Sequence, residues 1–219
     1  MATFDQLPEV RALEVLERLY EGTISPHRTL WDQSIAHRLA HGQTCTVYPS
    51  WPTNAPLWPL LVAMLHAQRF LEIGTGLGYT TVLMADAGGS SCHVDTIEAV
   101  PEHAELAERA FGARHLDDRI RVLRGSARDI LPRLADPYDI VFVDADWEGY
   151  PALLPDLLRL TRPGGLLVTG NLFPLFEPST QAAGQEALEE YLQRLVQEPG
   201  MRTFIVPGWW KALSYRLPG

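Results

Sequence analysis

Three glycines at alternate positions, Gly74, Gly76 and Gly78, separate an apolar run at residues 70–73 from a helix-forming stretch at residues 79–86. Glycine lets the backbone turn tightly and approach a ligand without a Cβ in the way. Open α/β sheets bind their ligands where a strand ends and the next helix begins. This turn therefore predicts an α/β fold with a ligand site at the end of its first strand.

The rest of the chain alternates short apolar runs with helical patterns. Besides residues 70–73, the runs that predict strands are residues 93–98, 119–123, 138–144, 166–169, 203–206 and 213–217. Helices are expected at residues 79–86, 127–134, 153–160 and 180–197 and after Pro101, with a turn of the chain at residues 162–165. Because strands that alternate with helices form doubly wound sheets, we predict an α/β, Rossmann-like fold with a seven-stranded, mostly parallel sheet.

The N-terminal part of the chain has a different pattern. Apolar residues recur at helical spacing over residues 7–20, and a shorter helix is expected at residues 32–41. Three prolines within residues 47–56 predict an irregular, aromatic segment. Helices and an irregular segment before the core are typical of a lid over a ligand site.

Composition narrows the classes of function. The chain carries 18 Lys and Arg against 27 Asp and Glu, a net charge of −9, without a basic cluster. Nucleic-acid binding relies on clustered cations, so such a partner is disfavoured. No apolar run reaches about 18 residues and no signal-peptide pattern is present, so no membrane partner is expected.

Domain organisation and redox compartment follow from what the chain lacks. No Gly- or Ser-rich linker divides it, so residues 1–219 are expected to form one domain, with a helical lid region at 1–65 and a core at 66–219. Only Cys45 and Cys92 are present, and neither lies in a motif. Two free thiols predict a cytoplasmic protein.

The glycine spacing restricts the ligand. An NAD-binding loop would place its third glycine at position 79, which is Tyr79 here, and there is no Gly-Lys-Ser/Thr phosphate loop. The spacing suits a ligand that has no phosphate and that carries an ammonium and a cationic sulfur. Glu72, just before the loop, can offset that positive charge; capping of nearby backbone N–H groups is the alternative.

Two further acidic positions follow strand ends. Glu98 ends the second predicted strand, where its two oxygens can accept both hydroxyls of a ribose. Gly125 and Ser126 follow the third strand and could contact an adenine, although Ser126 could equally cap the next helix. Asp144 ends the fourth strand and faces the ligand crevice, where it could accept from an amine, bind a metal or orient a nucleophile.

On these motifs the chain resembles the S-adenosylmethionine (SAM)-dependent O-methyltransferases of the caffeoyl-CoA and catechol type, which have the class I methyltransferase fold. The matching stretches are residues 71–80, 96–98, 125–127, 141–146 and 162–166, and the terminal stretches 204–208 and 212–215 are also similar. The resemblance implies that SAM is the cofactor. It places the following residues around SAM: Glu72, Gly74, Thr75, Gly76, Gly78, Tyr79, Thr80, Glu98, Gly125, Ser126, Ala127 and Asp144.

The family also uses a divalent metal to hold two oxygens of the acceptor. The resemblance assigns its ligands to Asp144 and to an Asp-Asn pair at the end of the fifth strand, with a helper Lys three residues after Asp144. This chain has Gly170 and Asn171 at the pair and Trp147 at the Lys position. Neutral donors cannot replace a carboxylate for a hard cation, so no metal is expected, although Asp144, Asn171 and Asp146 with waters could form a weak site.

Without a metal, the acceptor proton needs a protein base. Asp144 and Asp146 are the nearest candidates, Asp146 being otherwise a helix cap, and His37 or His41 could reach in from the N-terminal region. Aromatic residues expected near the pocket mouth suggest an aromatic acceptor, or else lid packing. They are Trp31, Tyr48, Trp51, Trp147, Trp209 and Trp210.

We therefore predict an enzyme that methylates a hydroxyl of a small acceptor from SAM. Two alternatives remain: a SAM-binding module that has lost turnover, and a methyltransferase acting on a tRNA base. A homodimer is a further possibility that the resemblance raises.

Overall fold

The computed structural model describes residues 8–42, 45–172, 175, 182–206 and 210–219. At its centre is a seven-stranded sheet in the order β3-β2-β1-β4-β5-β7-β6. Five neighbouring strands are parallel: β1 (Arg69–Ile73), β2 (His93–Glu98), β3 (Ile120–Arg124), β4 (Tyr138–Val143) and β5 (Thr161–Thr169). β7 (Lys211–Arg216) is antiparallel both to β5 and to β6 (Met201–Val206). The predicted α/β class and mostly parallel sheet are confirmed.

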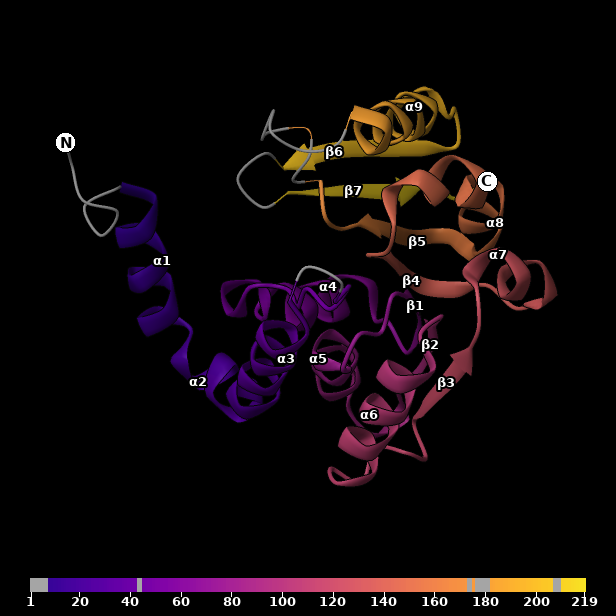
Figure 1. The fold of residues 1–219 in the computed structure, drawn as a ribbon. Helices are drawn as coiled ribbons and strands as arrows, with labels where there is room; N and C mark the ends of the chain where they lie inside the picture. Colours follow the sequence, from indigo (N-terminus) through magenta and orange to yellow (C-terminus); the bar gives the residue numbers. More distant parts are fainter. Residues whose placement is uncertain (1–7, 43–44, 173–174, 176–181, 207–209) are drawn as a thin grey trace.

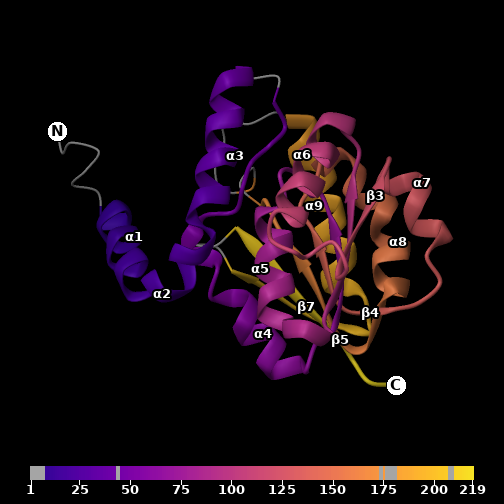
Figure 2. The same ribbon diagram turned by 90° about the horizontal axis from the view of Figure 1, so that it is seen from below.

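Helices cover both faces of the sheet and make a three-layer molecule (Figure 1, Figure 2). One face carries α4 (Leu57–Leu65), α5 (Tyr79–Gly88) and α6 (Pro101–Gly112), and the other α7 (Ala127–Ile130), α8 (Tyr150–Leu160) and α9 (Ala182–Gln197). Short 3-10 turns lie at Ser25–His27, Pro52–Asn54, Gly89–Ser91, Leu131–Arg133 and Trp147–Gly149.

Successive residues of the central strands point to opposite faces of the sheet and pack into two separate hydrophobic cores. Phe70 and Phe142 pack under α4 and α5, whereas Leu71 and Val143 pack under α8 and α9. A strand buried on both faces must be apolar at nearly every position, which is why the sequence of β4 reads as a continuous hydrophobic run. This burial fixes the carboxyl ends of β1 and β4 side by side.

The N-terminal helices lie beside the sheet. They are α1 (Pro8–Leu19), α2 (Glu21–Ile24) and α3 (Arg28–His41). α3 anchors Leu30 and Ser34 in the interior, with the Ser34 hydroxyl donating to the Leu30 carbonyl at 2.9 Å. α1 projects away from the body of the molecule (Figure 1, Figure 2). No helix in the described ranges is long and apolar enough to cross a membrane.

Several boundaries differ from the sequence expectation. α3 begins four residues before residue 32, and α8 begins at Tyr150 and not at residue 153. α7 ends at Ile130 and continues only as a 3-10 turn, because Pro132 has no N–H to extend the helix. α4 was not expected; it begins at Leu57, directly after the irregular segment predicted at residues 47–56, and Pro59 is tolerated in its first turn.

The expected turn at residues 162–165 is wrong in part. β5 already begins at Thr161. Its pairing with β4 shifts in register between Tyr138 and Ile140, and Gly164 and Gly165 lie in the unpaired part of β5. A local irregularity in a paired strand therefore replaces a separate turn. Residue 7 of the first expected helix and residues 180 and 181 of the last lie outside the described residues.

Candidate functional site

The glycine turn brings the end of β1 into contact with the end of β4. Gly74 has φ +99°, and a Cβ there would lie 2.1 Å from the carbonyl oxygen of Asp144. Its N–H donates to the Ile97 carbonyl at 3.0 Å, which joins the turn to β2 as well. Only glycine permits both this conformation and this approach. The turn thus lies over three neighbouring strand ends.

Gly78 has a different role from the predicted one. It has φ +87° at the N-terminus of α5, and a Cβ there would lie 2.4 Å from the ring of Phe111 on α6. Gly78 therefore allows α5 and α6 to pack closely, and it is not part of the cavity wall. This glycine serves the scaffold that holds the turn.

Glu98 closes the turn from β2. Its Oε2 accepts from the N–H of Gly76 at 2.9 Å, and its Oε1 accepts from the N–H of Val100 at 2.9 Å. The side chain is buried, yet it borders the cavity. Each oxygen keeps a lone pair beyond its backbone bond, so the carboxylate is held rigidly and can still accept from a ligand diol.

Glu72 lies at the end of β1, directly before the turn, but it does not border the cavity. It is fully buried within the sheet, and its Oε2 accepts from the hydroxyls of Thr81 at 2.5 Å and Thr96 at 2.6 Å. Burial raises the pKa of Glu72 to about 8, because desolvation disfavours the charged form. Thr75 extends this network to the cavity through its 2.6 Å hydroxyl contact with Thr96. Glu72 thus supports the turn through hydroxyl groups and not through backbone N–H groups.

The remaining predicted residues meet around one cavity of about 660 Å³ at the carboxyl end of the sheet. Cavities of this size hold drug-sized ligands. The predicted residues that line it are Gly74, Thr75, Gly76, Tyr79, Thr80, Glu98, Gly125, Ser126, Ala127, Asp144 and Asp146. The Ser126 hydroxyl also accepts from the N–H of Arg128 at 3.2 Å, so Ser126 caps α7 while it borders the cavity.

Asp144 lies opposite a residue that the sequence analysis did not single out. Asp144 follows β4, Gly170 follows β5 and Lys211 begins β7, and these three strands are neighbours. Because Thr169 pairs with Ala212 in the antiparallel register, Gly170 and Lys211 come next to each other. A Cβ at Gly170 would lie 2.9 Å from Cγ of Asp144. The missing side chain at position 170 leaves room for the Asp144 carboxylate beside the strand end that neighbours Lys211.

Asp144 and Lys211 each influence the pKa of the other. Burial raises the pKa of Asp144 to about 6, and the Lys211 ammonium opposes that rise. Burial likewise lowers the pKa of Lys211, and the Asp144 carboxylate opposes that fall. The Lys211 ammonium also lies 5.8 Å from the centre of the Phe142 ring. For both groups desolvation is the largest cause of the pKa shift, and the opposite charge offsets part of it.

These residues do not fit the divalent metal that the family resemblance implies. Mg²⁺ prefers several oxygen ligands, and position 170 supplies none. The space that a carboxylate would need there is occupied by Asp144 itself. A buried ammonium beside Asp144 further disfavours a second cation.

The aromatic residues lie in two groups. Trp147 and Tyr48 line the cavity, and Nε1 of Trp147 donates to the Asn171 carbonyl at 2.8 Å. Trp31 and Trp51 form a tilted pair with ring centres 6.4 Å apart outside the cavity. Trp210 packs in the second core, and Trp209 lies outside the described residues.

Of the other predicted bases, Asp146 is exposed at the cavity rim and receives the Gly149 N–H through its backbone carbonyl, not its side chain. His41 is exposed at the end of α3. His37 lies beside His103, which borders the cavity and which the sequence analysis did not single out.

A signal for Lys211 was available in the sequence. It is the only lysine in the 219 residues, and it lies in a strand whose alternate residues, Leu213 and Tyr215, face the core. Arginine is used at every other basic position apart from histidine. Since lysine changes its pKa readily when buried and arginine does not, a lone lysine in an inward strand position indicates a buried charge.

Comparison with known proteins identifies the family. A family model described as O-methyltransferase matches residues 44–207. Catechol O-methyltransferase from Niastella koreensis is 36% identical over 144 residues, which are 62% of this chain and 65% of that protein. Catechol O-methyltransferase from Mycobacterium tuberculosis is 37% identical over 147 residues, 65% of this chain and 66% of that protein. The matched part thus spans just under two thirds of these relatives.

A solved structure agrees over a longer stretch. The O-methyltransferase TomG from Streptomyces achromogenes, in complex with SAM, has a TM-score of 0.72 and 25% identity, covering 86% of this chain and 89% of that one. The chain belongs to the O-methyltransferase family. The predicted resemblance and the class I methyltransferase fold are confirmed.

Proposed function

We propose that this O-methyltransferase family member transfers a methyl group from SAM to a hydroxyl of a small aromatic acceptor without a divalent metal. Support for SAM comes from the turn at Gly74 and Gly76 and from the Glu98 carboxylate, which together form a cradle for a ribose and an amino acid moiety. The SAM complex of TomG supports the same ligand. The observation that carries the metal-free mechanism is the position of Lys211, which the pairing of β5 with β7 brings next to Gly170, where Asp144 also lies.

In this mechanism Asp144 is the proton acceptor. When bound, SAM supplies an electrophilic methyl group on a cationic sulfur. The Asp144 carboxylate takes the proton of the acceptor hydroxyl, so that the oxygen can form its bond to the methyl carbon as the carbon–sulfur bond breaks and sulfur keeps the electron pair. With a pKa of about 6, Asp144 is ionised at neutral pH and is a better base than an ordinary carboxylate.

Lys211 acts through Asp144 and is a positioning residue. Its ammonium favours the ionised form of the carboxylate that burial would otherwise protonate. It thereby replaces part of the electrostatic role that a metal plays for an acceptor oxygen. Trp147 and Tyr48 form flat walls of the cavity, which is the support for an aromatic acceptor.

The test combines binding and turnover. Calorimetric titration with SAM is expected to show one site per chain. Product is then sought by mass spectrometry over a panel of catechols, phenols and hydroxylated nucleosides, each on gel-filtered protein without added Mg²⁺ and again with Mg²⁺. We expect methylation of a phenolic acceptor at equal rates in both conditions. A rate that depends on Mg²⁺ would overturn the metal-free mechanism, and SAM binding without any product would favour a binding module.

The oligomeric state is a separate proposal. α1 stands away from the body and exposes Leu13 and Leu19, with 36% and 71% of their surfaces accessible. An apolar helix face of this kind supports a homodimer. Light scattering after size exclusion should give twice the 24.5 kDa chain mass, and a monomer at micromolar concentration would contradict it.

A further inference from the structure

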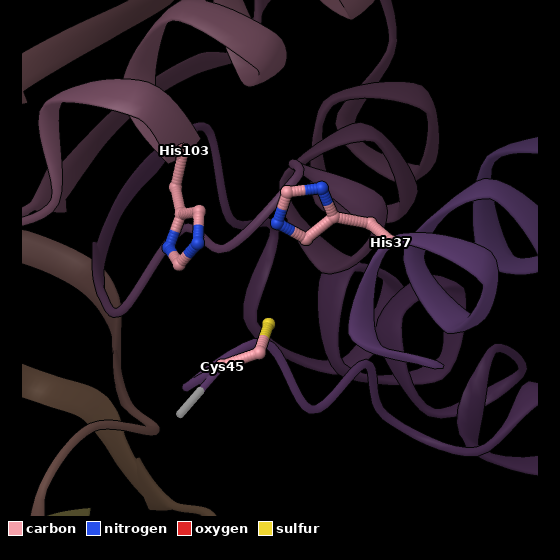
Figure 3. A group of neighbouring side chains, drawn as sticks. All are labelled: His37, Cys45 and His103. Atoms are coloured by element: carbon pink, nitrogen blue, oxygen red, sulfur yellow. The ribbon is translucent and has the colours of Figure 1, made fainter. Parts of the chain in front are cut away.

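Three potential soft-metal ligands meet at the edge of the cavity, away from Asp144. Ligand atoms of His37, Cys45 and His103 all lie within 4.8 Å of one another. Figure 3 shows ring nitrogens of the two histidines turned toward each other, with the Cys45 sulfur beside both. The residues come from α3, from the segment that follows α3, and from α6, so the fold assembles the group over a long stretch of chain.

Hydrogen bonds from Arg38 and Val47 hold Cys45 in position. Nη1 of Arg38 donates to the carbonyls of Cys45 at 3.3 Å and Val47 at 3.4 Å, which ties this segment to α3 next to His37. The Val47 N–H donates to the Cys45 sulfur at 3.5 Å, which fixes the position of the side chain. Cys45 and His103 are buried, at 6% and 7% exposure. The ligand positions are thus set by the scaffold.

The donor set indicates the metal. Two imidazoles and a thiolate suit Zn²⁺, whereas Mg²⁺ and Ca²⁺ require oxygen ligands. In a tetrahedral zinc site with Zn–N of about 2.1 Å and Zn–S of about 2.3 Å, ligand atoms lie about 3.5 Å apart. The observed ligand atoms would need to approach one another by about 1.3 Å at most. Side-chain rotation can supply a movement of that size.

A carboxylate lies behind one of the ligands. Oε1 of Glu98 is 3.9 Å from Nδ1 of His103. Histidines that bind metals usually present their other ring nitrogen to a carboxylate or carbonyl, which orients the ring and raises its basicity. Nδ1 facing Glu98 leaves Nε2 of His103 for a metal. The arrangement also places the group next to the proposed ribose-binding residue.

We propose that His37, Cys45 and His103 form a zinc site that fastens α3 and the Cys45 segment to α6 at the edge of the cofactor cavity. Three protein ligands leave a fourth position for water. Because His103 and Val47 both border the cavity, zinc would hold the N-terminal wall in place over it. The site is separate from Asp144, and its existence does not depend on the proposed methyl transfer.

The alternative is a metal-free cluster of rings. The His37 ring stacks on the His41 ring at 4.1 Å and meets the His103 ring edge-on at 5.3 Å, contacts that could suffice without an ion. The two explanations differ in whether the cysteine sulfur binds a cation. The test therefore reads out the sulfur directly.

The experiment uses the full chain after chelator treatment. Equilibrium dialysis against ZnCl₂ with elemental analysis is expected to give one tight zinc per chain, and CoCl₂ is expected to give a thiolate-to-cobalt charge-transfer band. Cys45→Ser and His103→Gln should each weaken zinc binding by at least a hundredfold. Matched controls are Cys92→Ser, which changes the other buried thiol, and His93→Gln, which changes an exposed histidine at the start of β2; both should bind zinc as the unchanged chain does.

A second measurement uses the unchanged chain, so its result does not depend on whether the variants fold. Iodoacetamide labelling of the unchanged chain, read by mass spectrometry, should slow at Cys45 by at least tenfold when zinc is added, with Cys92 as the internal reference. The proposal is overturned if the cobalt band is absent, or if zinc alters neither Cys45 labelling nor the thermal unfolding temperature. None of these readouts requires a methyl acceptor, so a failure of the proposed function is distinguishable from a failure of the zinc site.

Discussion

The two halves of the cavity are built in different ways. The donor half, formed by residues 74–76 and Glu98, depends on backbone conformation and on backbone N–H groups that Glu98 accepts. The acceptor half depends on side chains brought together by packing: Asp144 after β4, Lys211 at the start of β7 and Trp147 in a 3-10 turn, with Gly170 after β5 leaving space between them. The donor half keeps its family pattern, and the acceptor half departs from it at positions 147 and 170.

The contrast shows which part of such a site can change. A backbone cradle tolerates few substitutions, because a Cβ at Gly74 would meet a carbonyl oxygen at 2.1 Å. A set of side chains can exchange a metal ligand for a glycine if another charge takes over. In the proposed mechanism Lys211 is that charge, and four tests of this contrast are given below in order of expected effect.

The largest effect is expected from Gly74→Ala in the donor half. The new methyl group would collide with the Asp144 backbone in a conformation that alanine disfavours, so we expect a loss of about 4 kcal/mol in the free energy of unfolding. Urea denaturation measures it. The matched control is Gly76→Ala, where φ is +55° but the nearest atom is a flexible Val47 methyl at 3.8 Å; it should lose about 1 kcal/mol. Equal losses in the two variants would show that contact with β4 is not the reason for Gly74.

Asp144→Asn tests the acceptor half. The amide keeps the shape but cannot take a proton, so kcat should fall about 1000-fold. The SAM dissociation constant should change by less than tenfold, because the cradle is untouched. Single-turnover assays and SAM calorimetry separate the two effects, and Asp146→Asn serves as the control at the exposed rim. A fall below tenfold in Asp144→Asn, or an equal fall in the control, would assign the base elsewhere.

Glu98→Gln tests the donor half with a smaller change. One backbone N–H, of Gly76 or of Val100, would then face an amide NH₂ and not an oxygen. The lost acceptor and weaker ligand contact should raise the SAM dissociation constant about thirtyfold, or about 2 kcal/mol, while kcat at saturating SAM falls less than threefold. Calorimetry and steady-state kinetics check this split. If kcat fell by as much as SAM binding weakened, the donor half would also contribute to the chemical step, and the two halves would not act independently.

Lys211→Met has the smallest expected effect and a specific signature. The ammonium lowers the pKa of Asp144, so its removal should raise that pKa above about 6. Activity that needs the carboxylate rises as pH passes the pKa, and the acid limb should therefore move to higher pH. We expect about a tenfold loss of kcat at pH 6.5 that largely disappears at pH 9, with an unchanged acceptor KM.

A control and a direct measurement sharpen the Lys211 test. Lys211→Arg keeps the charge and should keep the acid limb near its original pH. Because Lys211 is the only lysine, ¹⁵N-lysine labelling should give one side-chain NMR signal, which reports its lowered pKa directly. A uniform loss of activity at every pH would mean that Lys211 has only a packing role.

Much of the donor half could be predicted because its pattern is local. Gly74, Gly76 and Glu98 each lie at a strand end, and strand ends of a parallel sheet meet at one edge. Gly78 and Glu72 lie beside the turn without bordering the cavity, which the sequence did not indicate. Their partners, Phe111 and the hydroxyls of Thr81 and Thr96, become visible only once helices and strands have packed.

The amino-acid sequence by itself determined the fold class, the ligand edge of the sheet and the donor cradle, since hydrophobic periodicity and glycine spacing act over a few residues. Only the tertiary structure decided what faces Asp144 and what surrounds Cys45. The approach of Lys211 depends on the antiparallel register of β7. The group of His37, Cys45 and His103 depends on the fold bringing α3 and the segment after it close to His103 on α6. Such long-range contacts are set by the burial of whole elements, and no short stretch of sequence encodes them.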